Sequence, residues 1–492
     1  MTRHDHNVKL STTQDSERKY PNVVTIRNVD YPAVCWQRHT AIECEQYTMN
    51  INSKPLVAVK EKLMIPFIRC LVTCVFLCLI AGSVSGEDWS HWRGAARNGI
   101  VAESSGWKDG KWPLHESWRV QVPEGASSPI VVNGQLFTTG WQEDQEHVVC
   151  LDTMSGKELW RQSYPCPKYG RLATGDEGLY SGPSSTPEFD TQTGLLYTLS
   201  TDGDLNCWNT RSKGQRVWSL NLYDSFDVPQ RPRVGRSGLR DYGYTSSPLI
   251  HADWLIVEVG ARQGNLIAFD KKNGMRAWAS QSNASAGHNA GPVLMMIEGQ
   301  PCVAIHNHDG LLVARLDSGK EGQTVATYPW ITSFANNIAS VAVHDDCVLL
   351  TSAYNQNRIA KLRITLKGAE LQWEQKAASK VCTPLIYDGH VYWAWQNLFC
   401  LNFETGRIVW SGGTCGDAGS CIVTADEKLI VWAGNGDLSL VELADRSSEE
   451  YTELASMKRI GKTDAWPHIA LSNGRLYCKD RNGQIVCLEL LP

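Results

Sequence analysis

Short apolar stretches of strand length alternate with glycine-centred turns, and no long amphipathic segment with a 3.6-residue period interrupts them. The stretch after Pro129 is typical, because IVVNGQLFTTG, HVVCLD and ELWRQ follow one another with turns between them. Each such unit predicts four short antiparallel strands, here called A to D. Turn sequences such as VNG, YDG and SNG between strands A and B favour tight hairpins.

One hairpin recurs with a fixed spacing. A short strand ends in an acidic residue or Asn, a Gly turn follows, and a Trp stands four residues beyond that Gly. Clear copies are Cys150–Trp160 (CLDTMSGKELW), Ala268–Trp278 (AFDKKNGMRAW) and Cys400–Trp410 (CLNFETGRIVW). An internal repeat of this kind determines the architecture, because each copy is one unit that packs against its neighbours.

A second recurrent feature, the small-residue element, consists of two small residues and a Pro, about twenty residues before each hairpin. Its copies begin at Ser127, Ser185, Ser246, Ala290 and Cys382 with the Pro kept, and at Ala339, Gly419 and His468 without it. Eight copies predict eight units of four strands. Units of this size, repeated along the chain, indicate an all-β, eight-bladed β-propeller.

The eighth unit lacks its fourth strand. It starts near His468 and reaches strand C at QIVCLEL, with no Gly turn and Trp after it. The segment Glu116–Val122 (ESWRVQV) offers a strand that has its own Trp118. We expect this N-terminal strand to complete the last blade, because the pairing closes the ring and removes two open sheet edges.

The hairpin spacing A-x-D-x-x-T-G-K-x-x-W resembles the tryptophan-docking motif of the pyrroloquinoline-quinone (PQQ) repeat family, whose members are eight-bladed propellers. Matching positions are Asp152, Gly156, Lys157 and Trp160 in one copy and Ala268, Asp270, Gly274 and Trp278 in another. The copies that end at Trp218 and Trp373 depart from the pattern. The resemblance covers residues 115–492, and it implies the fold more strongly than any chemistry.

The first 86 residues lie outside the repeats. Met64–Gly86 (MIPFIRCLVTCVFLCLIAGSVSG) has Arg69 before an apolar run and small residues at its end, which predicts a secretory signal peptide cleaved before Glu87. An uncleaved membrane anchor is the alternative, although the run Cys70–Ile80 is shorter than the roughly 20 residues that span a bilayer. We therefore expect a periplasmic or secreted protein.

Four regions follow from these patterns. Residues 1–63 are interpreted as an extension upstream of the true start, 64–86 as the signal peptide, 87–114 as an N-terminal strap and 115–492 as the propeller. The strap begins with EDWSHWRGAARNG, which looks like the W-x-x-x-R-G lead-in of many secreted bacterial propellers of unknown function. We expect Trp89 and Trp92 to pack across the ring.

Charge excludes one class of partner. Residues 1–86 hold 10 of the 47 basic and 7 of the 52 acidic residues, so 37 basic and 45 acidic side chains remain, a net charge of −8. This balance argues against a nucleic-acid partner.

Eleven of the 16 Cys residues follow the predicted signal peptide. No Cys-x-x-Cys or His-Cys cluster has the spacing of metal ligands, so a zinc site is not supported. Cys415 and Cys421 flank a Gly-rich segment and either pair in an oxidising compartment or stay free. The same strand C position, where a small buried residue is expected, is occupied by Cys150, Cys207, Cys400 and Cys487.

Candidate binding residues fall on the connections between units and on the B–C turns, which should surround the mouth of a central channel. The insert Asn221–Tyr244 carries four Arg residues among Tyr residues, which suits a planar or carboxylate-bearing ligand; a solvated loop pinned by Asp residues is the alternative. The candidates for ligand binding at this mouth are Arg236, Arg240, Asp241, Tyr242, His288, Asn289, Asn337 and Trp466.

The family name suggests a PQQ-dependent quinoprotein alcohol dehydrogenase, with the cofactor in the central channel on calcium. Asp241, Asn289 and Asn337 could converge as calcium ligands. Members with that activity usually stack PQQ between a Trp and an adjacent Cys-Cys disulfide. This chain has neither an adjacent Cys pair nor a Cys-x-x-Cys-His haem motif.

We therefore predict a non-catalytic scaffold, with no catalytic or metal residues, that binds a protein partner or a small polar ligand. In this it would be similar to the propeller lipoprotein of the outer-membrane barrel assembly machinery, and it would associate with the cell envelope. The dehydrogenase is the alternative. A sugar-processing enzyme is a third hypothesis, and it would need two acids facing each other across the channel.

Overall fold

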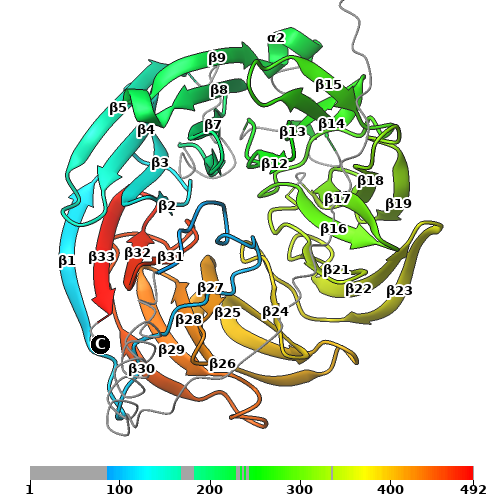
Figure 1. Cartoon of the computed structure of the whole chain (residues 1–492). Coiled ribbons are helices and arrows are strands. Elements are labelled where there is room, and N and C mark those ends of the chain that lie inside the picture. The colour runs from blue at the N-terminus through cyan, green and yellow to red at the C-terminus, as the bar shows by residue number, and fades with distance from the viewer. Residues whose placement is uncertain are drawn as a thin grey trace, which may run out of the picture. The chain divides into compact units, whose positions relative to one another are not determined.

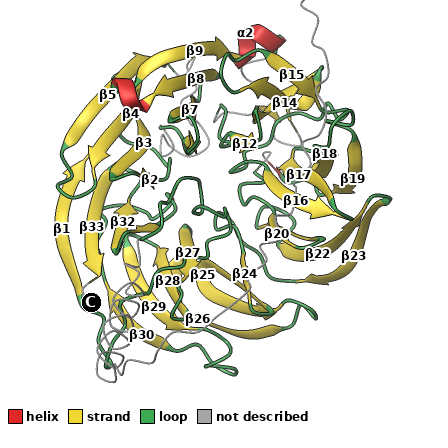
Figure 2. Ribbon diagram, in the orientation of Figure 1, coloured by secondary structure: helices red, strands yellow, loops and turns green. Residues whose placement is uncertain are grey.

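The computed structural model describes residues 86–167, 182–228, 233–234, 238–239, 243–333 and 336–490. These residues belong to one compact unit, Gly82–Pro492. Their strands form eight antiparallel sheets arranged as the blades of a ring (Figure 1), so the predicted all-β, eight-bladed propeller is confirmed. Strands dominate the described part of the chain, and its helical segments are the single turns α2 (Leu222–Phe226) and η2 (Thr210–Ser212) (Figure 2).

The first four blades follow one another along the chain. Blade one comprises β2 (Ile130–Val132), β3 (Gln135–Gln142), β4 (Gln145–Asp152) and β5 (Glu158–Pro165), and blade two comprises β6 (Glu188–Asp190), β7 (Leu195–Leu199), β8 (Asp204–Asn209) and β9 (Gln215–Asn221). Blade three comprises β12 (Leu249–His251), β13 (Trp254–Ala261), β14 (Gly264–Asp270) and β15 (Arg276–Ala279), and blade four comprises β16 (Val293–Ile297), β17 (Gln300–Asn307), β18 (Gly310–Arg315) and β19 (Thr324–Pro329). A separate two-stranded sheet, β10 (Arg233–Val234) with β11 (Gly238–Leu239), lies in the connection to blade three.

The remaining blades continue in chain order. Blade five comprises β20 (Ala342–His344), β21 (Cys347–Ser352), β22 (Arg358–Thr365) and β23 (Gly368–Gln375), and blade six comprises β24 (Leu385–Tyr387), β25 (His390–Asn402) and β26 (Ile408–Gly416). Blade seven comprises β27 (Gly419–Val423), β28 (Lys428–Ala433), β29 (Asp437–Glu442) and β30 (Glu453–Met457), and blade eight comprises β31 (Ala470–Ser472), β32 (Arg475–Lys479), β33 (Gln484–Leu490) and β1 (Leu114–Gln121).

Blade six has three assigned strands because β25 contains both strand B and strand C. Its residues 390–392 pair with β24, and its residues 396–401 pair with β26. The chain reverses at Gln396, whose φ is 60°. The rings of Trp393 and Phe399 stack across this reversal, with centroids 5.0 Å apart.

The A–B turns have the geometry that their sequences predict. Asn133 and Gly134 have φ of 51° and 74°, and Asn473 and Gly474 have φ of 54° and 70°. Two consecutive residues with positive φ give the type I′ turn, whose twist matches that of the strands on either side. Gly and Asn are therefore needed at these positions to keep strand A next to strand B.

The ring closes as the sequence predicts. β1 pairs antiparallel with β33, with Trp118 opposite Cys487, and the sheet order is β1-β33-β32-β31. Figure 1 shows β1, near the N-terminus of the described chain, beside the C-terminal β33. The strand begins two residues earlier than predicted and ends one residue earlier. This pairing covers edges that would otherwise be open to association.

Four of the docking Trp residues pack on the motif Gly of the next blade. The Trp118 indole donates a hydrogen bond to the Thr153 carbonyl (2.9 Å) in blade one. Trp160 of blade one packs on Gly214 of blade two so closely that a Cβ on Gly214 would lie 2.5 Å from the indole ring. The Gly of the motif is thus required by the Trp of the preceding blade as well as by its own turn.

Each of four docking Trp residues stands beside a Cys on strand C and an aromatic residue on strand B. In blade one these are Trp160, Cys150 and Phe137, which are direct cross-strand neighbours. All of the strand C cysteines named above are buried free thiols, as expected for packing residues. Cys415 and Cys421, which could have paired, are also separate buried thiols.

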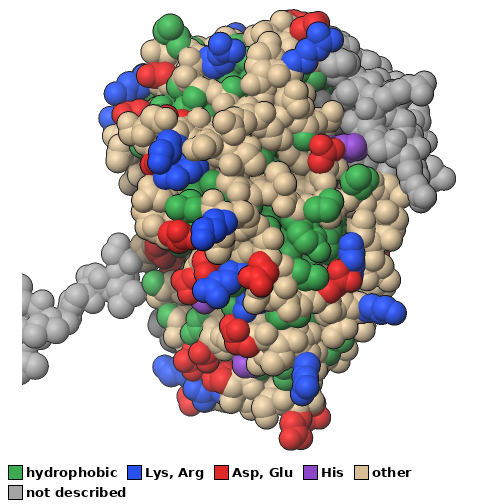
Figure 3. Space-filling model, turned by 90° about the vertical axis from the view of Figure 1, so that its right-hand side faces the viewer, with side chains coloured by type: hydrophobic (Ala, Val, Ile, Leu, Met, Phe, Trp, Pro, Cys, Tyr) green, Lys and Arg blue, Asp and Glu red, His purple; other side chains and the backbone are tan. Residues whose placement is uncertain are grey.

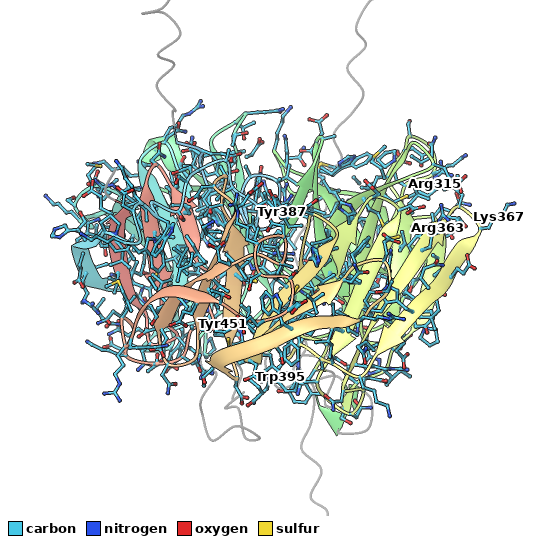
Figure 4. The ribbon with its side chains drawn as sticks, turned by 90° about the horizontal axis from the view of Figure 1, so that it is seen from below. Arg315, Arg363, Lys367, Tyr387, Trp395 and Tyr451 are labelled. Carbon is cyan, nitrogen blue, oxygen red and sulfur yellow. The ribbon has the colours of Figure 1, made fainter. Side chains whose placement is uncertain are left out.

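The two faces of the ring carry different connections. A–B and C–D turns lie on one face, and B–C turns lie on the opposite face with the connections between blades. Figure 4 shows Tyr387 and Lys367, at an A–B and a C–D turn, toward one face, and Trp395, at the B–C turn of blade six, toward the other. The described residues contain no helix that is long and apolar enough to span a membrane. The predicted signal peptide, except Gly86, lies outside the described residues.

Candidate ligand-binding site in the central channel

The centre of the ring contains a cavity of ≈ 930 Å³, a volume that includes its open mouth. All eight blades contribute to its wall. Many of the lining residues belong to the small-residue elements or lie beside them, because these elements place the chain at the channel just before each strand A. This group comprises Ser128, Thr186, Ser247, Ala290, Ile338, Cys382, Thr383, Gly419, Ser420 and His468.

Hydroxyl groups of the small-residue elements join neighbouring blades around the channel. Each of five lining hydroxyls accepts a hydrogen bond from a backbone N–H of an adjacent blade. The donor and acceptor pairs are His468 N with Ser128 Oγ (2.8 Å), Ser128 N with Thr186 Oγ1 (3.1 Å), Thr186 N with Ser247 Oγ (2.9 Å), Ser340 N with Thr383 Oγ1 (3.0 Å) and Ile469 N with Ser420 Oγ (3.0 Å). The small-residue element therefore has two roles, since it connects blades and forms the cavity wall.

The strap lies on the face of the A–B turns. Trp89 forms a β-bridge with Val131 of blade one, and Ile100 forms one with Val423 of blade seven. The Glu103 carboxylate accepts hydrogen bonds from the backbone amides of Asn473 (2.7 Å) and Gly474 (2.6 Å) in the A–B turn of blade eight. Figure 1 shows this segment crossing the centre of the ring.

The W-x-x-x-R-G motif of the strap fits this position. The Trp89 ring contacts Gly94, whose φ of 88° favours glycine. The buried Arg93 donates from Nη2 to the carbonyls of Asn98 and Pro384, both at 3.0 Å, which ties the strap to blade six. Trp92 lines the cavity, so the strap forms part of the cavity wall.

An ion-pair cluster fixes the strap to blade two. The buried Glu188 of β6 contacts His91 Nδ1 (3.0 Å) and the Arg97 guanidinium, and it accepts a hydrogen bond from the Ile250 amide (3.0 Å). Burial alone would raise the pKa of Glu188, but Arg97 and His91 hold that pKa below its ordinary value. This carboxylate therefore acts as a structural anchor and is not available as a catalytic base.

The structure places the predicted site residues in three groups. His288, Asn289 and Trp466 line the cavity. Asn337 lies behind the wall, where its Oδ1 accepts from the His288 amide (3.4 Å) and its Nδ2 donates to the His306 carbonyl. The other predicted residues, Arg236, Arg240, Asp241 and Tyr242, lie outside the described residues.

Asn289 is held by a buried acid that the sequence did not single out. Its Nδ2 donates to Glu258 Oε2 (2.7 Å), and Glu258 Oε1 accepts from the Gly287 amide (3.1 Å). Both side chains are about 1% exposed. Glu258 is an acidic residue near the end of a buried strand, in VEVG, and this position is the signal that could have identified it.

The described lining combines hydroxyl and amide groups with apolar side chains. It contains no Asp, Glu, Lys or Arg side chain. Burial, with a contribution from Arg93, lowers the pKa of His468 to about 3, so this lining residue is neutral at pH 7. Within the described chain, no group of three His, Cys, Asp or Glu residues could hold a metal ion.

The sequence profile of the family described as outer membrane protein assembly factor BamB matches residues 144–412, more than half of the chain. The chain belongs to this PQQ-repeat family. A comparison with curated proteins gives no match.

Solved structures similar to this member of the PQQ-repeat family include both binding proteins and enzymes. BamB from Moraxella catarrhalis is 12% identical, with a TM-score of 0.52 over 77% of this chain and 100% of its own. A europium-containing methanol dehydrogenase is 11% identical, with a TM-score of 0.57 over 81% of this chain and 89% of its own. A quinohemoprotein alcohol dehydrogenase from Comamonas testosteroni is 12% identical, with a TM-score of 0.55 over 84% of this chain and 82% of its own. At these identities the likeness shows the fold alone.

The residues of the described cavity do not fit the quinone for which the family is named. PQQ carries three carboxylates and is held on calcium, so its site needs cationic side chains and oxygen ligands of high charge. The described lining offers neither. Of the predicted calcium ligands, Asn337 uses its Oδ1 to accept from the His288 amide and its Nδ2 to donate to the His306 carbonyl, and Asp241 lies outside the described residues.

Proposed function

We propose that this chain is a non-catalytic binding propeller of the cell envelope, exported to the periplasm or secreted, which binds its ligand at the channel mouth. The observation that carries this proposal is the described cavity, whose lining contains no Asp or Glu side chain that could act as a general base. The matched family supports it, because it is described as an outer membrane protein assembly factor.

The arrangement of the ring indicates the side from which a ligand approaches. The strap lies on the face of the A–B turns, so we expect a ligand or partner to approach the face with the inter-blade connections. On the side of the ring that carries β19 and β23, charged side chains of both signs are interspersed with apolar ones (Figure 3). This side shows no continuous stripe of basic side chains of the kind that binds nucleic acid.

Incubation of the purified protein with PQQ and calcium tests this function directly. We expect no stoichiometric quinone absorbance after gel filtration and no dye-linked oxidation of primary alcohols. A quinoprotein alcohol dehydrogenase reconstituted in parallel is the positive control.

A second measurement tests the export of the protein. We expect the natural protein, isolated from its host, to start at Glu87 and to fractionate with the periplasm or the medium. A quinone spectrum together with alcohol oxidation in the first experiment would contradict the proposed binding function. An uncleaved chain in the cytoplasm would contradict the proposed export.

A further inference from the structure

The hydroxyls around the cavity have an unused hydrogen-bonding capacity. The five that accept an inter-blade N–H are between 1% and 8% exposed. None of them donates its O–H hydrogen to an acceptor among the described residues. Each hydroxyl has one donor in addition to its acceptor lone pairs, and a buried donor without an acceptor is costly. Five O–H donors therefore require an acceptor inside the cavity. They belong to Ser128, Thr186, Ser247, Thr383 and Ser420.

Asn289 adds an unsatisfied acceptor to the same wall. Its Nδ2 is fixed by Glu258 Oε2, which defines the orientation of the amide. The Asn289 Oδ1 atom is buried and accepts no hydrogen bond in the described chain. A molecule that satisfies this wall must therefore supply a donor at Asn289 as well as acceptors to the hydroxyl ring.

Charge and shape narrow the class of that molecule. The described lining contains no Asp, Glu, Lys or Arg side chain, so a strongly ionised ligand would lose its hydration without gaining an ion pair with one of these groups. Trp92, Tyr354 and Trp466 contribute aromatic rings to the same cavity, and such rings favour a ligand with a flat apolar face.

We propose that the central cavity binds a neutral carbohydrate. Sugar hydroxyls donate and accept around a ring, and the C–H face of the sugar stacks on an aromatic side chain. This inference rests on the proposed binding function and specifies its ligand class. It involves no chemical change in the sugar, since no carboxylate pair lines the described cavity.

Calorimetry and ligand-observed NMR on the mature chain test the inference, with glucose, galactose, cellobiose and trehalose as neutral probes and with sulfate and gluconate as anionic probes. We expect at least one neutral sugar to bind at millimolar or lower concentration and both anions to fail. Thr383→Val removes one ring hydroxyl at similar volume, and Asn289→Ala removes the unsatisfied acceptor. Each should weaken sugar binding by about 3- to 10-fold, the effect of one neutral hydrogen bond.

Ser340→Ala is the matched control. Ser340 Oγ belongs to a small-residue element and donates to the Gly291 carbonyl (2.9 Å), but it does not line the cavity. This variant should lose similar stability and retain sugar affinity. Equal losses of affinity in the Ser340 and Thr383 variants would overturn the inference.

The remaining outcomes are also decisive. Binding of sulfate or gluconate alone, or of no probe by a chain that unfolds cooperatively, overturns the carbohydrate assignment. Those outcomes leave the binding function intact as long as PQQ and calcium give no quinone spectrum. A quinone spectrum instead contradicts the proposed function itself, so the two failures can be told apart.

Discussion

At the scale of single residues, the ring depends on glycines that have no room for a side chain. Gly214 has a φ of +72°, and a Cβ built on it would lie 2.5 Å from Trp160 Cζ3. Gly299 has a similar φ of +77°, but nothing lies within 4 Å of its Cβ position. Substitution of Gly299 therefore measures the cost of backbone strain alone, whereas substitution of Gly214 adds the cost of the clash with Trp160.

Gly299→Ala should cost about 1–2 kcal/mol of unfolding free energy, because an L-residue is strained in the left-handed region. Gly214→Ala should cost about 1–3 kcal/mol more, because the new methyl group overlaps the docking Trp. Urea unfolding of both variants measures the difference. Equal costs would show that Trp160 is not locked on Gly214.

A buried acid between blades one and two gives a pH dependence. Glu146 is fully buried and accepts from the Tyr164 hydroxyl (2.9 Å), and burial raises the pKa of its carboxyl to about 8. The folded state thus keeps this proton after the unfolded chain has lost it. Its contribution to stability is complete below the unfolded pKa and declines as pH rises through about 8.

Glu146→Gln, which stays neutral at every pH, should remove that decline. Relative to the natural chain, the variant should gain on the order of 3 kcal/mol between pH 5 and pH 8. Urea unfolding across this range measures the effect. The slope with pH is the readout, because the Gln also changes the hydrogen bond that the Thr201 amide donates to Glu146 Oε2 (3.4 Å). The exposed Glu143→Gln is the control, and the same slope in both variants would refute the assignment.

At the scale of elements, the strap behaves as part of the ring. Glu103 is 7% exposed and accepts three backbone N–H groups, from Glu87 (3.0 Å), Asn473 and Gly474. It therefore joins the start of the strap to the last blade. Such charge-assisted bonds from backbone amides are stronger than neutral ones.

Glu103→Gln should loosen the strap, because the amide presents a donor where an N–H already points. We expect a loss of about 1–3 kcal/mol and faster hydrogen exchange at Asn473 and Gly474. Exchange measured by mass spectrometry and urea unfolding test this. Glu116→Gln, at an exposed ion pair with Arg119, is the control with little expected effect. Unchanged exchange in the Glu103 variant would mean that the strap is held elsewhere.

At the scale of the whole molecule, the repeat explains both stability and site. Eight antiparallel sheets form a ring in which each blade contacts its neighbours, and β1 with β33 completes the circle. Because every blade enters at the channel with its small-residue element, the ring gathers eight short segments around one cavity. The site is thus a property of the closed ring and of no single blade.

Much of this fold could be predicted from the sequence. Strand alternation, the I′ turn at Asn133 and Gly134, the docking Trp residues and the closing strand with Trp118 are all local or periodic signals. They are visible in the chain because turn conformation and strand pairing depend on residues close in sequence or at a fixed repeat spacing.

The candidate site was predicted only in part. His288, Asn289 and Trp466 were placed at the channel by their position in the repeat, and they line the cavity. The role of Thr383 and its equivalents as cavity wall was not foreseen, because a small hydroxyl residue before a strand gives no sign of the direction in which it points. Asn337 was placed in the site, but it bonds to the backbone of its neighbours instead.

The sequence by itself thus determined the number of blades, the strand order and the closure of the ring, since these follow from repeated local patterns. Only the tertiary structure decided what the channel contains. Trp92 belongs to a strap that is far in sequence from most of the blades that line the cavity with it. Glu258 accepts a hydrogen bond from Asn289 across a loop, and each cavity hydroxyl accepts one from a backbone amide of another blade. Contacts between segments so far apart in the chain depend on how the closed ring places them, and no local pattern encodes them.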